Sequence, residues 1–267
     1  EVWSDGRPGW SDLPAVARLI GRLRAARFDR VYDLQCQGRT NRYFQLLWPH
    51  RPPWSGNAPG AAMSYREPDR NRLHIQDLWV KQLALAGITD VPPPDLSWLV
   101  GDAARFAIAG PYALLAPGGA AHRQAKRWPA PHFAAVAARW HAETGGGVVA
   151  MGAPGDIPLA EEILRGVGEG LNLAGRTALA EWAAALAACD AVVCNDSGGM
   201  HLAAALGRPV VAVFGATDPS VTGPLGPRAR VVQDDGPRAR AIARDDAAAE
   251  KRLAALSPER IYGELRS

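Results

Sequence analysis

Cysteines, long apolar runs and net charge are all scarce in this sequence of 267 residues. Its three cysteines, Cys36, Cys189 and Cys194, lack the spacing of a metal site, and two of them flank a predicted buried strand. We therefore expect the cysteines to be small core residues and the protein to lie in a reducing compartment. No apolar run approaches the ~20 residues that span a bilayer. The first residues, beginning at Glu1, do not resemble a signal peptide.

The balance of positive and negative residues also limits the kinds of partner that we expect. Thirty Lys and Arg against 27 Asp and Glu give a net charge of +3, without blocks of one sign. So small an excess does not indicate a nucleic-acid partner, but it suits anionic substrates and an anionic membrane surface. Hydrophobic residues make up 48% and charged residues 21%, as in globular proteins, and the length allows two domains.

The most informative stretch is residues 191–219, where apolar runs alternate with polar turns. Residues 191–194 and 210–214 are typical of strands buried on both faces, and residues 200–206 are typical of a short helix. Loops at the carboxyl ends of parallel strands form ligand sites, and a helix N-terminus there suits a phosphate. The candidates for this anion site are Asp196, Ser197, Gly198, Gly199, His201 and Thr217. The alternative is that Asp196 and Ser197 only cap the helix and His201 is a surface histidine.

A second candidate site lies in residues 117–129, a loop rich in glycine and cations after a predicted strand at 112–116. Arg123, Lys126 and Arg127 offer charges for a pyrophosphate, next to flexible backbone N–H groups. The order of residues is not that of a Walker A loop. Trp128 is predicted to pack and to fix the loop.

These residues carry a resemblance to a known family. The pattern Asp196-Ser197-Gly198-x-x-His201 followed by LAAALGxP, and then Phe214-Gly215-x-Thr217-x-Pro219, resembles the signature of glycosyltransferase family 9, the heptosyltransferases. The resemblance implies transfer of heptose from ADP-heptose to the inner core of lipopolysaccharide. It also implies the GT-B architecture, in which two Rossmann-like domains of α/β structure face each other across a cleft.

The resemblance implies roles for particular residues. Lys126, followed by Trp128 and Pro129, matches the lysine that binds the donor diphosphate. The family often has hydroxyl side chains at the two positions occupied here by Ala121 and His122, which puts that contact in doubt. Asp156 matches an acidic residue on the donor ribose, although it could instead cap a helix. Thr177 lies in the match to the loop near the adenine, whose backbone would read the base.

The catalytic base is the residue that the sequence does not supply. The family carries it on a Gly-Asp loop after a first strand, and we find no such loop before the predicted strand at 30–34. Either a segment is missing before Glu1 or the protein departs from the family there. We assign Lys126, Asp196 and His201 supporting roles in a metal-independent, inverting displacement, because cations and N–H groups can stabilise the leaving diphosphate. Asp196 could instead hold its turn or contact heptose hydroxyls.

The predicted elements alternate as in doubly wound sheets. Residues 1–105 are expected to form an N-terminal, acceptor-side Rossmann-like domain that is incomplete, because its first strand and Gly-Asp loop are not found. Residues 106–250 would form the nucleotide-sugar domain, and residues 251–267 a helix that packs back. Helices are predicted at 13–26, 42–48, 74–86, 133–143, 159–166 and 179–188, and strands at 147–151 and 171–173.

The acceptor side offers weaker signals. Residues 49–60 are predicted to be a loop because of their prolines and glycines; their His50, Arg51 and Trp54 could meet an acceptor sugar or pack on their own domain. Arg66, Arg70 and Arg72 form either an anion site or a solvated, self-paired surface.

Three functions follow. The first is a bacterial heptosyltransferase with no cofactor, at work in the cytoplasm in peripheral contact with the inner membrane. The second is a GT-B enzyme that uses a UDP- or GDP-linked sugar. The third is a non-catalytic binding protein of the same fold.

Overall fold

The computed structural model describes residues 1–119, 124–168, 170–215, 217–237 and 246–266. The chain divides into two compact units, Glu1–Pro92 and Pro93–Ser267. Residues 93–105, which the sequence analysis placed with the first domain, group instead with the second unit. The reason is local: Leu96 and Leu99 are apolar and pack against the core of that unit. Within the described residues, no helix is long and apolar enough to cross a membrane.

The first unit is a small parallel sheet with helices. Its strands β1 (Val31–Tyr32), β2 (Trp54–Gly56) and β3 (Met63–Ser64) pair in that order. Helices α1 (Leu13–Ala25), α2 (Gly38–Leu46) and α3 (Ile75–Leu85) complete it. Asp12 caps α1 through the backbone N–H of Ala15, and His74 caps α3. The three helices predicted in this region are thus present, with shifted ends.

One prediction in the first unit is wrong. Residues 49–60 are not all loop, because β2 lies within them and pairs with strands on both sides. None of the four prolines of this segment lies in the strand: Pro52 and Pro53 directly precede it, where a missing N–H breaks no ladder hydrogen bond. Pairing with distant strands, rather than local propensity, makes this three-residue strand.

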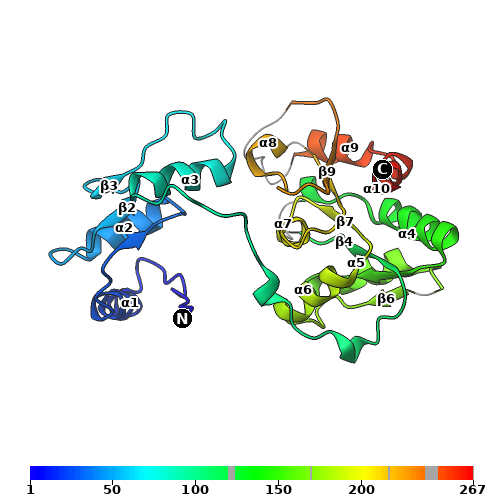
Figure 1. Cartoon of the computed structure of the whole chain (residues 1–267), viewed down its shortest axis with the longest axis horizontal. Coiled ribbons are helices and arrows are strands. Elements are labelled where there is room, and N and C mark those ends of the chain that lie inside the picture. Colours follow the sequence, from blue (N-terminus) through cyan, green and yellow to red (C-terminus); the bar gives the residue numbers. More distant parts are fainter. Residues whose placement is uncertain (120–123, 169, 216, 238–245, 267) are drawn as a thin grey trace. The chain divides into compact units, whose positions relative to one another are not determined.

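The second unit is built on a six-stranded parallel sheet (Figure 1) with the order β6-β5-β4-β7-β8-β9. Its strands are β4 (Tyr112–Ala116), β5 (Gly147–Ala150), β6 (Gly170–Asn172), β7 (Ala191–Asn195), β8 (Val210–Phe214) and β9 (Ala229–Gln233). The reversal of strand order lies between β4 and β7, which are neighbours in space. In doubly wound sheets a ligand crevice lies outside this point.

Helices cover both faces of this sheet. On one face α6 (Leu179–Ala188) and α7 (Gly198–Ala205) pack around Leu114, Val192 and Phe214. On the other, α4 (Ala130–Thr144), α5 (Ile157–Leu164) and α10 (Pro258–Arg266) pack around Leu115 and Val193. Alternate residues of each strand therefore serve opposite cores, which explains why the strands read as continuous apolar runs. The helix expected to pack back at the C-terminus does so, since α10 contacts α4, β7 and β8.

The apolar patterns that predict helices and strands were weaker after Gly226 and in short segments. They missed β9, α8 (Pro219–Thr222) and α9 (Ala247–Ala254), and the one-turn helices η1 (Ser97–Leu99), η2 (Ala104–Phe106), η3 (Gln124–Lys126) and η4 (Pro154–Asp156). Strand β9 alternates too little to be recognised, because only Val232 is fully buried. Its place is fixed by pairing with β8.

The cysteines are core residues, as expected. All three are free and buried. Burial raises the pKa of the Cys189 thiol to about 12, and burial together with the nearby Asp196 raises the pKa of Cys194 well above its usual range. Both thiols therefore stay protonated and behave as small apolar side chains.

Candidate functional site

A cavity of about 830 Å³ opens at the carboxyl ends of β4, β5 and β7 in the second unit. Because these strands are parallel neighbours, the loops that leave them lie at one edge of the sheet. The cavity has the size of small-molecule sites in general. Its lining includes these residues predicted from the sequence: Lys126, Asp156, Thr177, Asp196, Ser197, Gly198 and Gly199.

A buried polar cluster forms one wall. Lys126 makes an ion pair with Asp196, and the hydroxyl of Thr217 donates to the same carboxylate oxygen, Oδ2, at 2.8 Å. The side chains of Lys126 and Asp196 are 17% and 9% exposed, so the pair is largely shielded from water. Thr217 is 3% exposed and does not line the cavity. The ammonium group of Lys126 is the cation that this wall presents to a ligand.

The N-terminus of α7 lies beside this cluster. Ser197 occupies the N-cap position with extended backbone, but its side chain makes no capping hydrogen bond. An ideal Cβ on Gly198 would meet nothing within 4 Å, so the backbone there is open to a ligand. Helix N-termini present N–H groups and a partial positive charge to anions. This wall therefore has two independent features that suit a diphosphate.

Asp156 is held by its own domain. Its Oδ1 accepts from Arg127 at 3.2 Å and its Oδ2 accepts from the backbone of Ala153 at 2.9 Å. A Cβ on Gly118 would lie 2.3 Å from that Oδ2, so glycine is needed where the loop passes the carboxylate. Arg127 also donates to the carbonyl of Gly119 at 2.6 Å. The guanidinium of Arg127 thus binds groups of the chain itself, whereas the sequence had predicted that it would bind a pyrophosphate.

Two residues fix the loop that carries Lys126. Trp128 is 2% exposed, packs edge-on against Phe133 and donates from Nε1 to the carbonyl of Leu256 at 2.9 Å, which confirms its predicted packing role. Asn195 is fully buried; it accepts from the backbone of Trp128 at 3.0 Å and donates to the carbonyl of Pro117 at 2.7 Å. This role of Asn195 was not predicted from the sequence, in which its place at the end of a buried strand was the available signal.

The remaining lining is apolar and includes a tryptophan that the sequence analysis also missed. Trp182 of α6 borders the cavity, and a Cβ on Gly199 would lie 3.0 Å from its ring. The Nε1 of Trp182 is buried without a hydrogen-bond partner among the described residues. Thr177 follows Gly175, whose φ of +68° and contact with Pro154 both favour glycine. The cavity thus joins a polar, cationic wall to an apolar one lined by Ala116, Met151, Ala153, Pro154, Leu179 and Trp182.

Some predicted positions lie elsewhere. His201 belongs to the first turn of α7, is exposed and does not line the cavity. Ala121, His122 and Arg123 lie outside the described residues. Across the described parts of the chain, no group of three or more His, Cys, Asp or Glu residues is arranged to hold a metal ion.

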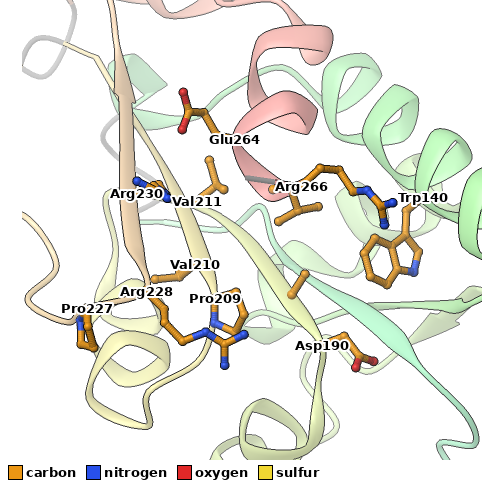
Figure 2. Close-up of a pocket in the computed structure, with 12 residues that line it drawn as sticks. Trp140, Asp190, Pro209, Val210, Val211, Pro227, Arg228, Arg230, Glu264 and Arg266 are labelled. Carbon is orange, nitrogen blue, oxygen red and sulfur yellow. The ribbon is translucent and has the colours of Figure 1, made fainter.

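A second cavity of about 370 Å³ lies at the opposite, amino ends of β7 and β8. Figure 2 shows Arg230 on β9, Arg228 just before that strand, Arg266 at the end of α10, and the ring of Trp140 below Arg266. None of the residues predicted for the site lines this cavity.

In the first unit, one of the residues predicted to meet an acceptor sugar has a packing role. Trp54 is 5% exposed and its ring centroid lies 5.4 Å from that of Phe44, so it packs on its own domain. Arg70 donates to the carbonyl of Gln35 at 3.4 Å. An anion site at Arg66, Arg70 and Arg72 stays a prediction.

Comparison with known proteins now decides the family. Residues 16–251 match the family model described as "Glycosyltransferase family 9 (heptosyltransferase)". The chain belongs to glycosyltransferase family 9. It is 33% identical over 243 residues to lipopolysaccharide heptosyltransferase 2 of Salmonella typhimurium, an alignment that covers 81% of this chain and 68% of the relative. Lipopolysaccharide heptosyltransferase 2 of Escherichia coli K12 is 34% identical over 244 residues, with the same two shares.

A solved structure agrees with this assignment. The structure of the E. coli ADP-heptose lipopolysaccharide heptosyltransferase II matches with a TM-score of 0.71 at 29% identity, over 93% of this chain and 78% of that one. This family 9 chain therefore has the α/β fold with parallel sheets of GT-B heptosyltransferases, and it is a glycosyltransferase. It is shorter than the relatives it matches.

Proposed function

We propose that this family 9 glycosyltransferase transfers heptose from ADP-heptose to a lipopolysaccharide core acceptor, with inversion at the anomeric carbon. The observation that carries the proposal is the convergence of Lys126 and the N-terminus of α7 on one cavity with an apolar half. A nucleoside diphosphate needs this combination, because its two ends differ in polarity. The names of the relatives that align over most of the chain support the choice of donor and acceptor.

The donor lies in the cavity with its diphosphate at Lys126 and at the turn from Ser197 to Gly199. Its base lies against the apolar wall, where backbone groups near Thr177 read the adenine edge. Asp156 is the candidate contact of the ribose, and its lining position supports this. Arg127 and the Ala153 backbone hold the carboxylate in place, so it is preorganised for that contact.

The chain's own charges serve the chemistry. Departure of the diphosphate develops negative charge on the leaving oxygen, which Lys126 and the N–H groups of α7 are placed to stabilise. This supports a reaction that needs no metal ion and no cofactor. Asp196 supports Lys126, and His201, in the first turn of α7, keeps the supporting role assigned to it. The acceptor hydroxyl loses its proton to a carboxylate that we do not assign.

The place of action follows from the acceptor. We assign the enzyme to the cytoplasm, in peripheral contact with the inner membrane. The three free, buried cysteines and the modest positive charge support this assignment.

Calorimetric titration with ADP, UDP and GDP tests the proposal. We expect ADP to bind preferentially and Lys126→Ala to weaken ADP binding by about 10- to 100-fold, because a hydrogen bond between charged groups contributes ~1.5–3 kcal/mol. Lys251→Ala is the matched control, since it removes a lysine of the same unit on the exposed surface of α9. Tighter binding of UDP or GDP would contradict the ADP-heptose donor, and binding of none of them would favour a non-catalytic protein.

A further inference from the structure

We propose that Thr217 is a positioning residue that acts on the donor through Asp196 and Lys126 and does not touch it. The inference rests on the proposed function, because it concerns the same donor cavity. It replaces the direct donor contact expected for Thr217 from the sequence.

Three loops from neighbouring strands meet at one oxygen atom. Lys126 belongs to the loop after β4, Asp196 directly follows β7, and Thr217 belongs to the loop after β8. The ammonium of Lys126 and the hydroxyl of Thr217 both donate to Oδ2 of Asp196. These residues lie 70 and 21 positions from Asp196 in the sequence, so the hydrogen bonds join separate parts of the sheet edge.

Burial separates the roles of the three side chains. Lys126 and Asp196 line the cavity and a ligand can reach them. Thr217 is 3% exposed and is not among the residues that line the cavity, although its hydroxyl donates to Asp196, which does line it. A hydroxyl in that place can influence a ligand only through the carboxylate to which it donates.

The hydroxyl limits the motion of a flexible cation. A lysine ammonium has three donors on a side chain with many rotamers, so its direction must be fixed by partners. One N–H held by Oδ2 leaves the other two available to a diphosphate. Thr217 fixes Oδ2 in turn, and without its hydroxyl the carboxylate can rotate and take the ammonium with it. Thr217 therefore preorganises the cation, which lowers the cost of ordering it when the donor binds.

The test is ADP affinity measured by calorimetry on the whole chain. Thr217→Val keeps the size and branching of the side chain but removes the hydroxyl, and we expect ADP to bind about tenfold more weakly, as for a lost hydrogen bond to a charged group. Thr217→Ser keeps the hydroxyl and should restore most of the affinity. Thr222→Val is the matched control, because Thr222 lies on α8 and its hydroxyl donates, among the described residues, to the backbone carbonyl of Asp218. Thr217→Ala replaces the valine variant if circular dichroism shows that valine unfolds the chain.

A double-mutant cycle separates positioning from a merely structural role. In an Asp196→Ala background, we expect Thr217→Val to change ADP affinity by less than twofold, because the group through which it acts is absent. Full affinity in Thr217→Val, or an undiminished tenfold loss in the Asp196→Ala background, would overturn the inference and leave the proposed function intact. If the unaltered chain binds no ADP, the proposed function fails and the inference fails with it.

Discussion

At the scale of single residues, Gly198 and Gly199 show how one turn can impose two different demands. Both begin α7 and both border the donor cavity. An added Cβ would meet nothing within 4 Å at Gly198, but at Gly199 it would lie 3.0 and 3.2 Å from two ring atoms of Trp182. The first glycine leaves space for a ligand, whereas the second allows α6 and α7 to approach each other.

This difference gives the first prediction. Gly199→Ala should lower the free energy of unfolding by about 1–2 kcal/mol, because the ring of Trp182, which packs against the core, must shift. Gly198→Ala is the control in the same turn; it should be neutral or slightly stabilising, since alanine is the better helix former and has open space. Urea denaturation of both variants measures the difference. Equal stability of the two variants would show that Trp182 adapts without cost.

At the scale of elements, the N-terminus of α6 is tied to the segment that enters the second unit. Glu181 accepts from the backbone of Ala178 at 2.8 Å, as in a capping box, and from Nη2 of Arg105 at 2.9 Å. Arg105 also donates to the carbonyl of Arg176. The hydrogen bond from Arg105, followed by that from Ala178, lowers the pKa of Glu181 to about 2.

The lowered pKa predicts how stability depends on pH. A carboxyl group with a depressed folded-state pKa stabilises the fold above its ordinary pKa, and this contribution is lost as the pH falls through the folded value. Glu181→Gln should therefore lower the urea midpoint at pH 7, and the difference from the unaltered chain should shrink from about pH 4.5 to about pH 2. Glu161→Gln, on the exposed side of α5, is the control. A difference that stays constant over this range would contradict the assigned cause.

At the scale of the whole molecule, the donor cavity belongs to one unit. All its lining residues lie between Ala116 and Gly199, within the unit Pro93–Ser267. That unit has a hydrophobic core on each face of its sheet, and the segment 93–111 packs on one of them through Leu96, Leu99 and Phe106. A chain with its own cores and its own cavity should fold and bind without the rest.

We therefore expect residues 93–267, expressed alone, to unfold cooperatively and to bind ADP within about threefold of the whole chain. Residues 1–92 expressed alone serve as the control and should bind no ADP. Circular dichroism and calorimetry measure the two properties. A folded second unit that has lost ADP affinity would show that the first unit contributes to the donor site.

The sequence by itself determined the elements with strong local patterns and the loops that carry the chemistry. The strand Tyr112–Ala116, the helix Leu179–Ala188 and the strand Val210–Phe214 lie where their apolar patterns predicted them. Lys126 and the turn at Asp196 were identified because polar loops at the ends of buried parallel strands are ligand sites. Both line the cavity.

Only the tertiary structure decided which of these loops meet. The strand β2 exists because β1 and β3 pair with it, and the pairs Arg127–Asp156 and Thr217–Asp196 join residues 29 and 21 positions apart. Local patterns specify a helix or a strand, since neighbouring residues determine backbone preference and which face is apolar. Contacts between distant side chains depend on strand order and on the direction of each loop, which are set by the packing of the whole sheet.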